Sequence, residues 1–261
     1  MAMIKKKTTC EKMLTIGTIL IILVLWFVST ALGWVDFKLV PSPQSVWAAF
    51  IDIMKNGYKN YTLLQHLGAS MERLGIAFFW AVVTAIPLGL ASGYNSKIRA
   101  VFEPIIDFYR PLPPLAYYTL LVLWLGIENG SKIALLFLAS FAPIYISCVS
   151  AVMKIKEDYI NSAYTIGASK MQIFFHVIFP ACLPDIFIGL RTALGVAYTT
   201  LVSAEMVAAN SGIGWMVLDA SRYLRSDIIF LGIIIMGITG ILLDRGILFI
   251  EHKVVPWEGK E

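Results

Sequence analysis

The chain has 261 residues, of which 58% are hydrophobic and 15% are charged. Soluble domains carry roughly 45–50% apolar and about 25% charged residues, so this composition excludes an ordinary soluble protein. The net charge of +4 comes from basic residues spread over many loops, which argues against a nucleic-acid or anion-binding surface. A mean hydropathy of +0.76 points instead to a membrane protein.

Several apolar stretches approach or exceed the roughly 20 residues that a helix needs to cross about 30 Å of hydrocarbon. The alternating pattern of a membrane barrel is absent, and backbone polar groups must be paired inside lipid, so these stretches predict helices. We therefore expect an all-α polytopic membrane protein. Its six predicted spans are Met13–Gly33, Leu67–Ala91, Phe102–Gly126, Lys132–Val152, Pro184–Met206 and Ile228–Phe249.

The distribution of lysine and arginine sets the expected orientation. With the N-terminus inside, the outer loops hold only Lys38, Lys55, Lys59, Lys132, Arg222 and Arg225. The cytoplasmic side holds twice as many basic residues, namely Lys5, Lys6, Lys7, Lys12, Lys97, Arg99, Lys154, Lys156, Lys170, Arg245, Lys253 and Lys260. Both termini are therefore expected in the cytoplasm. The first apolar run is longer than the 7–15 residues of a signal peptide, which favours an uncleaved first span.

The loop after the first span, Trp34–His66, is expected on the outer side. Within it, Val46–Met54 predicts a short interfacial helix with Val46, Ala49, Phe50 and Ile53 on one face.

The sequence predicts no catalytic site, metal site or cofactor on this chain. It contains no Gly-x-x-x-x-Gly-Lys-Ser/Thr loop for ATP. The histidines, His66, His176 and His252, are isolated from carboxylates and cysteines. The three cysteines, Cys10, Cys148 and Cys182, have neither metal-ligand spacing nor a disulfide framework.

A polar, basic-flanked segment, residues 158–180, lies between the fourth and fifth predicted spans. Asp158 is expected to cap a helix that starts at Tyr159, and Gly167 to end it in the left-handed region. Ser169-Lys-Met-Gln172 predicts a capping-box start for a second helix. Pro180 is expected to stop that helix, and Pro184 to lie in the first turn of the next span. The pattern predicts a helix–glycine–helix elbow on the cytoplasmic surface that contacts another protein.

This elbow resembles the EAA loop of ABC importer permeases of the type I class. Ala163, Gly167 and Pro180 match that motif, and Val177 is a close substitute. Asn161 replaces its acidic residue, Ser162 its first alanine and Phe179 its leucine. The resemblance implies that the elbow couples the permease to an ATPase through Asn161, Ser162, Ala163, Gly167, Ala168 and Pro180.

Further motifs look like those of nitrate, sulfonate and taurine permeases, and most like the taurine permeases. They include Ser70-Met-Glu-Arg73, Tyr109-Arg-Pro-Leu-Pro-Pro-Leu-Ala116, and Ala204-Glu205 with Gly212-Ile-Gly214. The resemblance runs from about Leu64 to the C-terminus. It implies an N-terminal tail, first span and outer loop (1–63), a type I permease domain (64–250) and a cytoplasmic tail (251–261).

The resemblance also implies an assembly in the bacterial inner membrane. Two permease copies would form the pathway as a homodimer, and two ATPase subunits carrying ATP and Mg²⁺ would sit beneath the elbows. An external binding protein would deliver taurine or a related small sulfonate, which crosses by alternating access. Nitrate, alkanesulfonates and pyrimidine precursors remain rival substrates. A gradient-driven secondary transporter and a non-transporting scaffold or channel remain rival classes.

Candidate pathway or gate residues are Arg110, Pro111, Pro113, Pro114 and Glu205. The prolines either kink the third span beside a gate or only mark helix entry at the interface. Glu205, near the outer end of the fifth span, is open to two interpretations. Its carboxylate either attracts the ammonium end of a zwitterionic substrate or accepts hydrogen bonds from backbone amides of the Ala208–Gly214 loop.

Overall fold

The computed structural model describes residues 9–257, and the side chains from residue 13 onward. Lys5, Lys6, Lys7 and Lys260 therefore lie outside the described residues, as do the side chains of Cys10 and Lys12. Within the described part the chain is helical, with no strand and one isolated bridge between Tyr58 and Tyr61. Its elements are α1 (Thr9–Ala31), α2 (Pro43–Asn56), α3 (Leu63–Tyr94), α4 (Ser96–Tyr109), α5 (Pro114–Leu125), α6 (Asn129–Met153), α7 (Glu157–Thr165), α8 (Lys170–Ile173), the π-helical turn η1 (Phe174–Ile178), α9 (Phe179–Ala208), α10 (Ile213–Arg222) and α11 (Ser226–Val254).

Five helical stretches of the described residues are long and apolar enough to cross a membrane. They are α1, α3, α6, the continuous stretch Lys170–Ala208 and α11, and they coincide with five of the six predicted spans. The third predicted span, Phe102–Gly126, is not one helix. It is divided between α4 and α5, because the proline-rich turn after Arg110 cannot supply the backbone N–H groups that a continuous helix needs.

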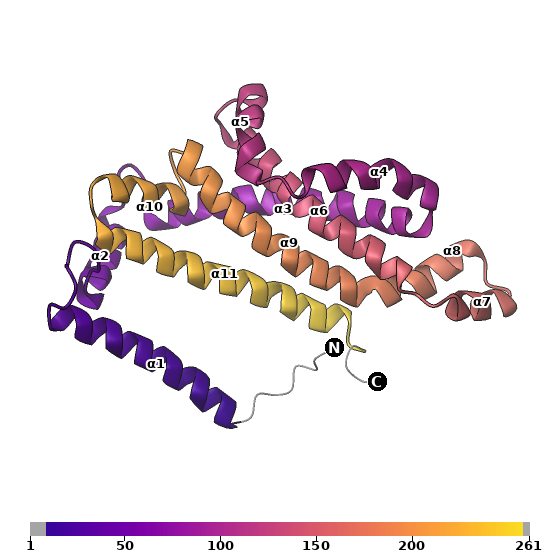
Figure 1. The fold of residues 1–261 in the computed structure, drawn as a ribbon, viewed down its shortest axis with the longest axis horizontal. Coiled ribbons are helices and arrows are strands. Elements are labelled where there is room, and N and C mark those ends of the chain that lie inside the picture. Colours follow the sequence, from indigo (N-terminus) through magenta and orange to yellow (C-terminus); the bar gives the residue numbers. More distant parts are fainter. Residues whose placement is uncertain (1–8, 258–261) are drawn as a thin grey trace.

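The centre of the bundle is α6, which packs between α3 and α9 (Figure 1). Gly89 of α3 lies against Tyr145 and Cys148, and Gly93 lies against Val152, so α3 and α6 run parallel and in close contact. The small-residue spacing Gly89–Gly93 therefore serves packing within this chain, as small residues do between membrane helices. Gly189 of α9 lies against Ser147 in the same way.

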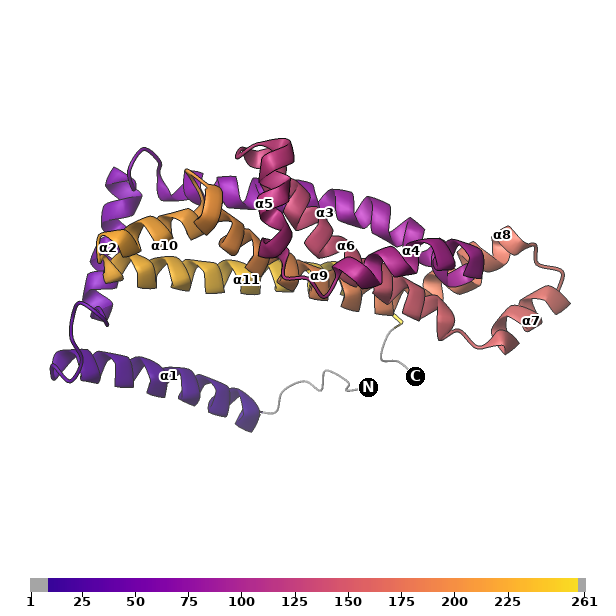
Figure 2. The ribbon, with the colours of Figure 1, turned by 45° about the horizontal axis from the view of Figure 1, so that its top comes forward.

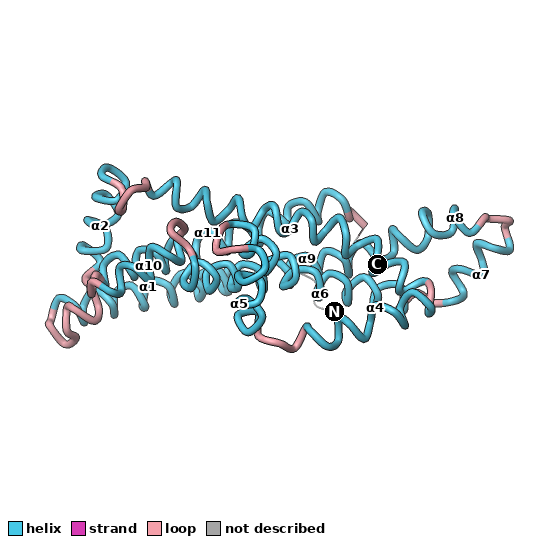
Figure 3. The backbone as a smooth tube through the Cα atoms, turned by 90° about the horizontal axis from the view of Figure 1, so that it is seen from above, coloured by secondary structure: helices cyan, strands magenta, loops and turns pink. Residues whose placement is uncertain are grey.

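The two ends of the bundle carry different elements (Figures 1 and 3). At one end α2 and α10 pack on α11, burying Val46, Ala49 and Ile53 as the predicted interfacial helix requires. At the other end α7 and α8 project beyond the bundle. Since α3 and α6 run parallel, residues 95–128 must return from the elbow end to the α10 end, and α4 and α5 make that return.

Helix α1 lies apart from the other helices for most of its length (Figure 2). Its apolar side chains are exposed along its whole face, which suits contact with lipid. Only its last turns are tied to the bundle: Trp26 donates from Nε1 to the Pro41 carbonyl at 2.9 Å and stacks on Phe230 at 5.9 Å between ring centroids.

Candidate functional site

The first helix of the elbow, α7, begins at Glu157, two residues earlier than its sequence predicts. Lys156 is the N-cap, and it offers no side-chain hydrogen bond. Asp158 therefore lies inside the first turn beside Glu157, and the prediction that it is the cap is wrong. Two carboxylates in the first turn still stabilise the helix, because they face its partially positive end.

Gly167 ends α7 in the left-handed conformation, as predicted, with φ of +83°. The Gly167 N–H donates to the Tyr164 carbonyl at 2.9 Å, and the Ala168 N–H donates to the Ala163 carbonyl at 3.1 Å. These two bonds form a Schellman motif, which satisfies the last carbonyls of a helix and needs a residue with positive φ. The hinge is therefore a defined turn.

The second helix starts with the predicted capping box. The Gln172 N–H donates to Ser169 Oγ at 3.4 Å, and the Ser169 N–H donates to Gln172 Oε1 at 2.8 Å. It does not stop at Pro180. The π-helical turn Phe174–Ile178 widens the backbone just before the proline, and the Phe179 N–H bonds to the Phe174 carbonyl. This widening relieves the clash that a proline ring makes in a regular helix.

As a result, α8, η1 and α9 form one continuous helical stretch of 39 residues. Both expectations about its prolines are therefore wrong: Pro180 lies at the start of α9, and Pro184 lies in its interior. The elbow has no flexible linker on its second side, and α8 joins the spanning helix directly.

The outer surface of the elbow carries large apolar side chains. Tyr159, Ile166 and Met171 are 62%, 85% and 68% exposed. Ala163 is buried against the bundle, Ala168 is half-buried, and Asn161 and Ser162 are exposed. The elbow is therefore anchored through Ala163 and Ile173, and it exposes polar and large apolar groups. Contact of this surface with another protein stays a prediction.

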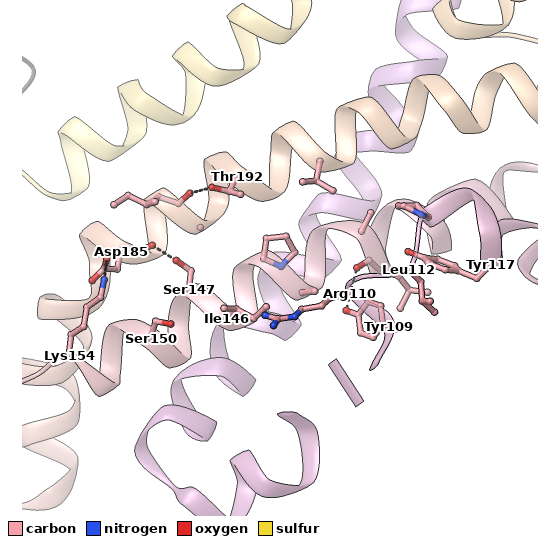
Figure 4. Close-up of a pocket in the computed structure, with 18 residues that line it drawn as sticks. Tyr109, Arg110, Leu112, Tyr117, Ile146, Ser147, Ser150, Lys154, Asp185 and Thr192 are labelled. Carbon is pink, nitrogen blue, oxygen red and sulfur yellow. Dashed lines mark hydrogen bonds and ion pairs between the residues drawn. The ribbon is translucent and has the colours of Figure 1, made fainter. Parts of the chain in front are cut away.

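A cavity of about 550 Å³ lies on the bundle between α4, α5, α6 and α9 (Figure 4). Arg110 and Pro114 line it, whereas Pro111, Pro113 and Glu205 do not. Its polar lining consists of Tyr109, Arg110, Tyr117, Ser147, Ser150, Lys154, Asp185 and Thr192. The chain is interrupted at these prolines between α4 and α5, beside this cavity, and a role of the interruption in gating stays a prediction.

The charged groups of the cavity are unevenly paired. Lys154 Nζ lies 2.8 Å from Asp185 Oδ1, which leaves that pair close to neutral. Arg110 Nε lies 3.4 Å from Asp107 Oδ1, the i, i+3 neighbour that the sequence suggests, and both side chains are about half exposed. Exposed ion pairs of this kind have small interaction energies, so the positive charge of Arg110 is compensated only in small part by Asp107.

Glu205 lies in a buried polar network at the α10 end, and its side chain is 1% exposed. It accepts hydrogen bonds from Ser70 Oγ and Arg73 Nη1, each at 2.7 Å. It also accepts one from the Gly214 N–H at 3.0 Å. A contact with a loop amide is present, and a direct role for Glu205 in transport stays a prediction.

Arg73 completes this network, and its role was not apparent from the sequence. Its guanidinium donates to Glu205, to the Ser211 carbonyl at 2.9 Å and to Asn129 Oδ1 at 2.8 Å. It thereby joins α3, α6, α9 and the loop before α10. Gly212, with φ of +126°, fits this loop because an added Cβ would fall 2.4 Å from the Glu205 carboxylate oxygens. A charge inside an apolar span is the only local signal for such a residue.

The fold, the exposed elbow and the cavity together define a polytopic helical transport protein. A family model described as "Binding-protein-dependent transport system inner membrane component" matches residues 85–255. The chain belongs to this family. It is an ABC transporter permease, a multi-pass inner membrane protein that acts as a transport component and not as an enzyme. Membership implies a partner ATPase and a substrate-binding protein.

Relatives cover nearly the whole chain. The taurine transport system permease protein TauC of Escherichia coli (strain K12) is 40% identical over 95% of this chain and 90% of its own. The putative aliphatic sulfonates transport permease protein SsuC of the same strain is 34% identical over 90% and 88%. The nitrate import permease protein NrtB of Synechocystis is 35% identical over 78% and 74%. The family resemblance read from the elbow and the later motifs is therefore confirmed.

Among solved structures, a chain of the inward-facing MetNI methionine ABC transporter superposes with a TM-score of 0.56 at 18% identity. The match covers 71% of this chain and 95% of that one. At this identity the likeness concerns the fold alone, and it supports the assignment to the type I permease fold.

Proposed function

We propose that this chain is the permease subunit of an ATP-driven importer for taurine or a related small sulfonate. The observation that carries the proposal is the identity of 40% with TauC over 95% of the chain. The sulfonate permease SsuC, at 34% identity, makes alkanesulfonates the second candidate class.

In this proposal two copies of the chain form the pathway, and each elbow docks on an ATPase subunit that carries ATP and Mg²⁺. The exposed side chains of Tyr159, Ile166 and Met171 provide the docking surface. Closure of the ATPases draws the two elbows together, and the helices joined to them rock between inward- and outward-facing states. Docking of the loaded binding protein outside favours the state in which the ATPases close.

The proposed topology has six crossings with both termini in the cytoplasm. Helices α4 and α5 together make the third crossing, because each is shorter than the roughly 20 residues that span hydrocarbon. Arg110 and Leu112 of the break line the cavity between α4, α5, α6 and α9, and non-helical backbone at membrane depth is tolerated where it lines a water-filled cavity.

Reconstitution tests this function directly. Proteoliposomes containing the permease, its ATPase and the binding protein are expected to accumulate radiolabelled taurine when ATP is supplied on the ATPase side. Vanadate is expected to block that uptake, and excess nitrate to leave it unchanged.

Three results would reject parts of the proposal. Uptake driven by an ion gradient without ATP would indicate a secondary transporter. ATP-driven uptake of nitrate or a pyrimidine precursor in place of taurine would support an ATP-driven importer and reject taurine as its substrate. Failure to copurify with an ATPase would favour a scaffold or channel.

A further inference from the structure

The cavity between α4, α5, α6 and α9 is large enough to hold a small solute together with water. Its volume of about 550 Å³ lies within the roughly 300–1,000 Å³ of ligand pockets. Its walls mix aromatic and aliphatic side chains with a few polar groups, as such pockets do. It lies in the part of the bundle where α3, α6 and α9 are in closest contact, between the elbow and the α10 end.

Arg110 is the charged group of this lining that has no strong partner. The other two, Lys154 and Asp185, pair with each other at 2.8 Å. The partner of Arg110, Asp107, approaches Nε at 3.4 Å and does not line the cavity. In Figure 4 the Arg110 side chain lies between the tyrosines on one side and the Lys154–Asp185 pair on the other.

The chemistry of a guanidinium fits one end of a sulfonate solute. Arginine presents five N–H donors in a planar fork, which bind tetrahedral or planar oxyanions through two parallel hydrogen bonds. Asp107 lies at Nε, on one side of the guanidinium, which leaves the terminal amino groups for a solute. The Tyr109 and Tyr117 rings, which line the same region, offer apolar faces for a short carbon chain.

We propose that this cavity is a transit site of the permease and that Arg110 is the residue that contacts the sulfonate group of the solute. The proposal rests on the function proposed above and assigns the anionic contact to one residue. Thr192, exposed on the α9 wall of the same cavity, provides a position from which the field of Arg110 can be measured.

The first experiment measures that field without any substrate. Thr192→Cys is reacted with two methanethiosulfonate reagents of similar size, one bearing an ethylsulfonate and one an ethyltrimethylammonium. Arg110→Gln is expected to lower the sulfonate-to-ammonium rate ratio roughly tenfold, because one unit charge acts oppositely on the two reagents. Free ethanesulfonate is expected to slow the reaction only when Arg110 is present. Adding phosphatidylglycerol to the phosphatidylcholine vesicles is not expected to slow the reaction.

Arg99→Gln is the matched control, since it removes a positive charge from the other end of the same helix. Arg99 contacts Met153 Sδ and does not line the cavity, so its loss is expected to leave the ratio unchanged. The chain without Thr192→Cys gives the background, which includes any reaction of Cys10, whereas Cys148 and Cys182 are buried. An unchanged ratio in Arg110→Gln, or no reaction of Thr192→Cys with either reagent, would overturn the proposal.

The second experiment measures taurine taken up per ATP hydrolysed in the reconstituted importer. Arg110→Gln is expected to lower this quotient at least fivefold, with stimulation of the ATPase by loaded binding protein retained, and Arg110→Lys to restore part of it. A wild-type importer that does not move taurine, combined with an Arg110-dependent rate ratio, would reject the proposed substrate and leave the anion site standing. If the wild-type importer moves taurine and Arg110→Gln leaves the taurine taken up per ATP unchanged, the Arg110 site is rejected and the proposed taurine import stands.

Discussion

Glu205 and Arg73 lie 132 residues apart in the sequence and 2.7 Å apart in the bundle. Each on its own is a charged residue in an apolar span, which marks it as special without naming its partner. Periodicity places both on helices, but it cannot pair them, because the pairing depends on how α3 and α9 cross. In contrast, Gly167 and the Ser169 capping box were predicted correctly, since their hydrogen bonds join residues close together in the chain.

The Arg73–Glu205 pair gives the first prediction. Removing one member of a buried ion pair costs about 3–5 kcal/mol, because the remaining charge is left uncompensated. Glu205→Leu and Arg73→Met are each expected to lower the melting temperature of the detergent-solubilised protein strongly. The double variant is expected to recover much of the loss. Additive effects of the two substitutions would contradict an energetic coupling.

Gly167 gives the second prediction. No atom lies within 4 Å of where its Cβ would be, so substitution there tests conformation and not crowding. Gly167→Val is expected to strain the left-handed residue by roughly 1–2 kcal/mol and to misdirect the elbow. Stimulation of the ATPase by loaded binding protein should fall while the permease still inserts.

Gly167→Asn serves as the control, because asparagine tolerates the left-handed region far better than valine does. It should retain most of the stimulation. Equal stimulation in the valine and asparagine variants would show that the turn does not matter for coupling.

At the scale of elements, the helices of the bundle were predictable because long apolar runs fix their existence and type. The elbow was predicted in outline, and the two errors about its prolines have one physical source. Proline rules describe regular helices, whereas the π-helical turn Phe174–Ile178 lets the chain pass Pro180 without breaking. The same rules succeeded at Pro111, Pro113 and Pro114, where no such turn is present and the span divides into α4 and α5.

Helix packing gives the third prediction. A Cβ added at Gly89 would lie 2.6 Å from Cys148 Cβ and 2.9 Å from the Tyr145 carbonyl. Gly89→Val is therefore expected to push α3 from α6 and to destabilise the protein by about 1–3 kcal/mol, measured as thermal unfolding in detergent. Gly75→Val lies on the same helix with open space around its Cβ and should unfold at the wild-type temperature.

The π-helical turn gives the fourth prediction. With alanine at position 180 the helix can close into a regular α-helix, which would turn α8 by about 100° relative to α9. Pro180→Ala is expected to reduce ATP-driven uptake by misplacing the elbow. Pro184→Ala, one turn further along the same helix, should have little effect. If both variants transport equally well, the turn at η1 has no part in coupling.

At the scale of the whole molecule, composition and the asymmetry of basic residues predicted a polytopic helical protein and an orientation for it. The cavity could not be predicted, because it is formed by side chains from four helices whose contacts the sequence does not reveal. The fold does not identify the substrate either, because relatives named for taurine, aliphatic sulfonates and nitrate are all similar to this chain.

Orientation gives the fifth prediction. Cysteines introduced at Asn56 and Asn210, both exposed at the α10 end, should react with a membrane-impermeant thiol reagent added to intact cells. A cysteine at Thr165, exposed on the elbow, should react only after the cells are opened. Labelling of Thr165 from outside would contradict a cytoplasmic elbow.

The unbroken stretch Lys170–Ala208 has a mechanical consequence. At 1.5 Å per residue its 39 residues make a rod of about 58 Å. Gly189, in close contact with Ser147 of α6, lies near its midpoint. A rigid helix that rotates about this contact has two arms of similar length. The displacements of the elbow and of Glu205 should therefore be comparable in size and opposite in direction. The hydrogen bonds between Arg73 and Glu205 at one end would then restrain the elbow at the other end, even though the two ends are not in contact.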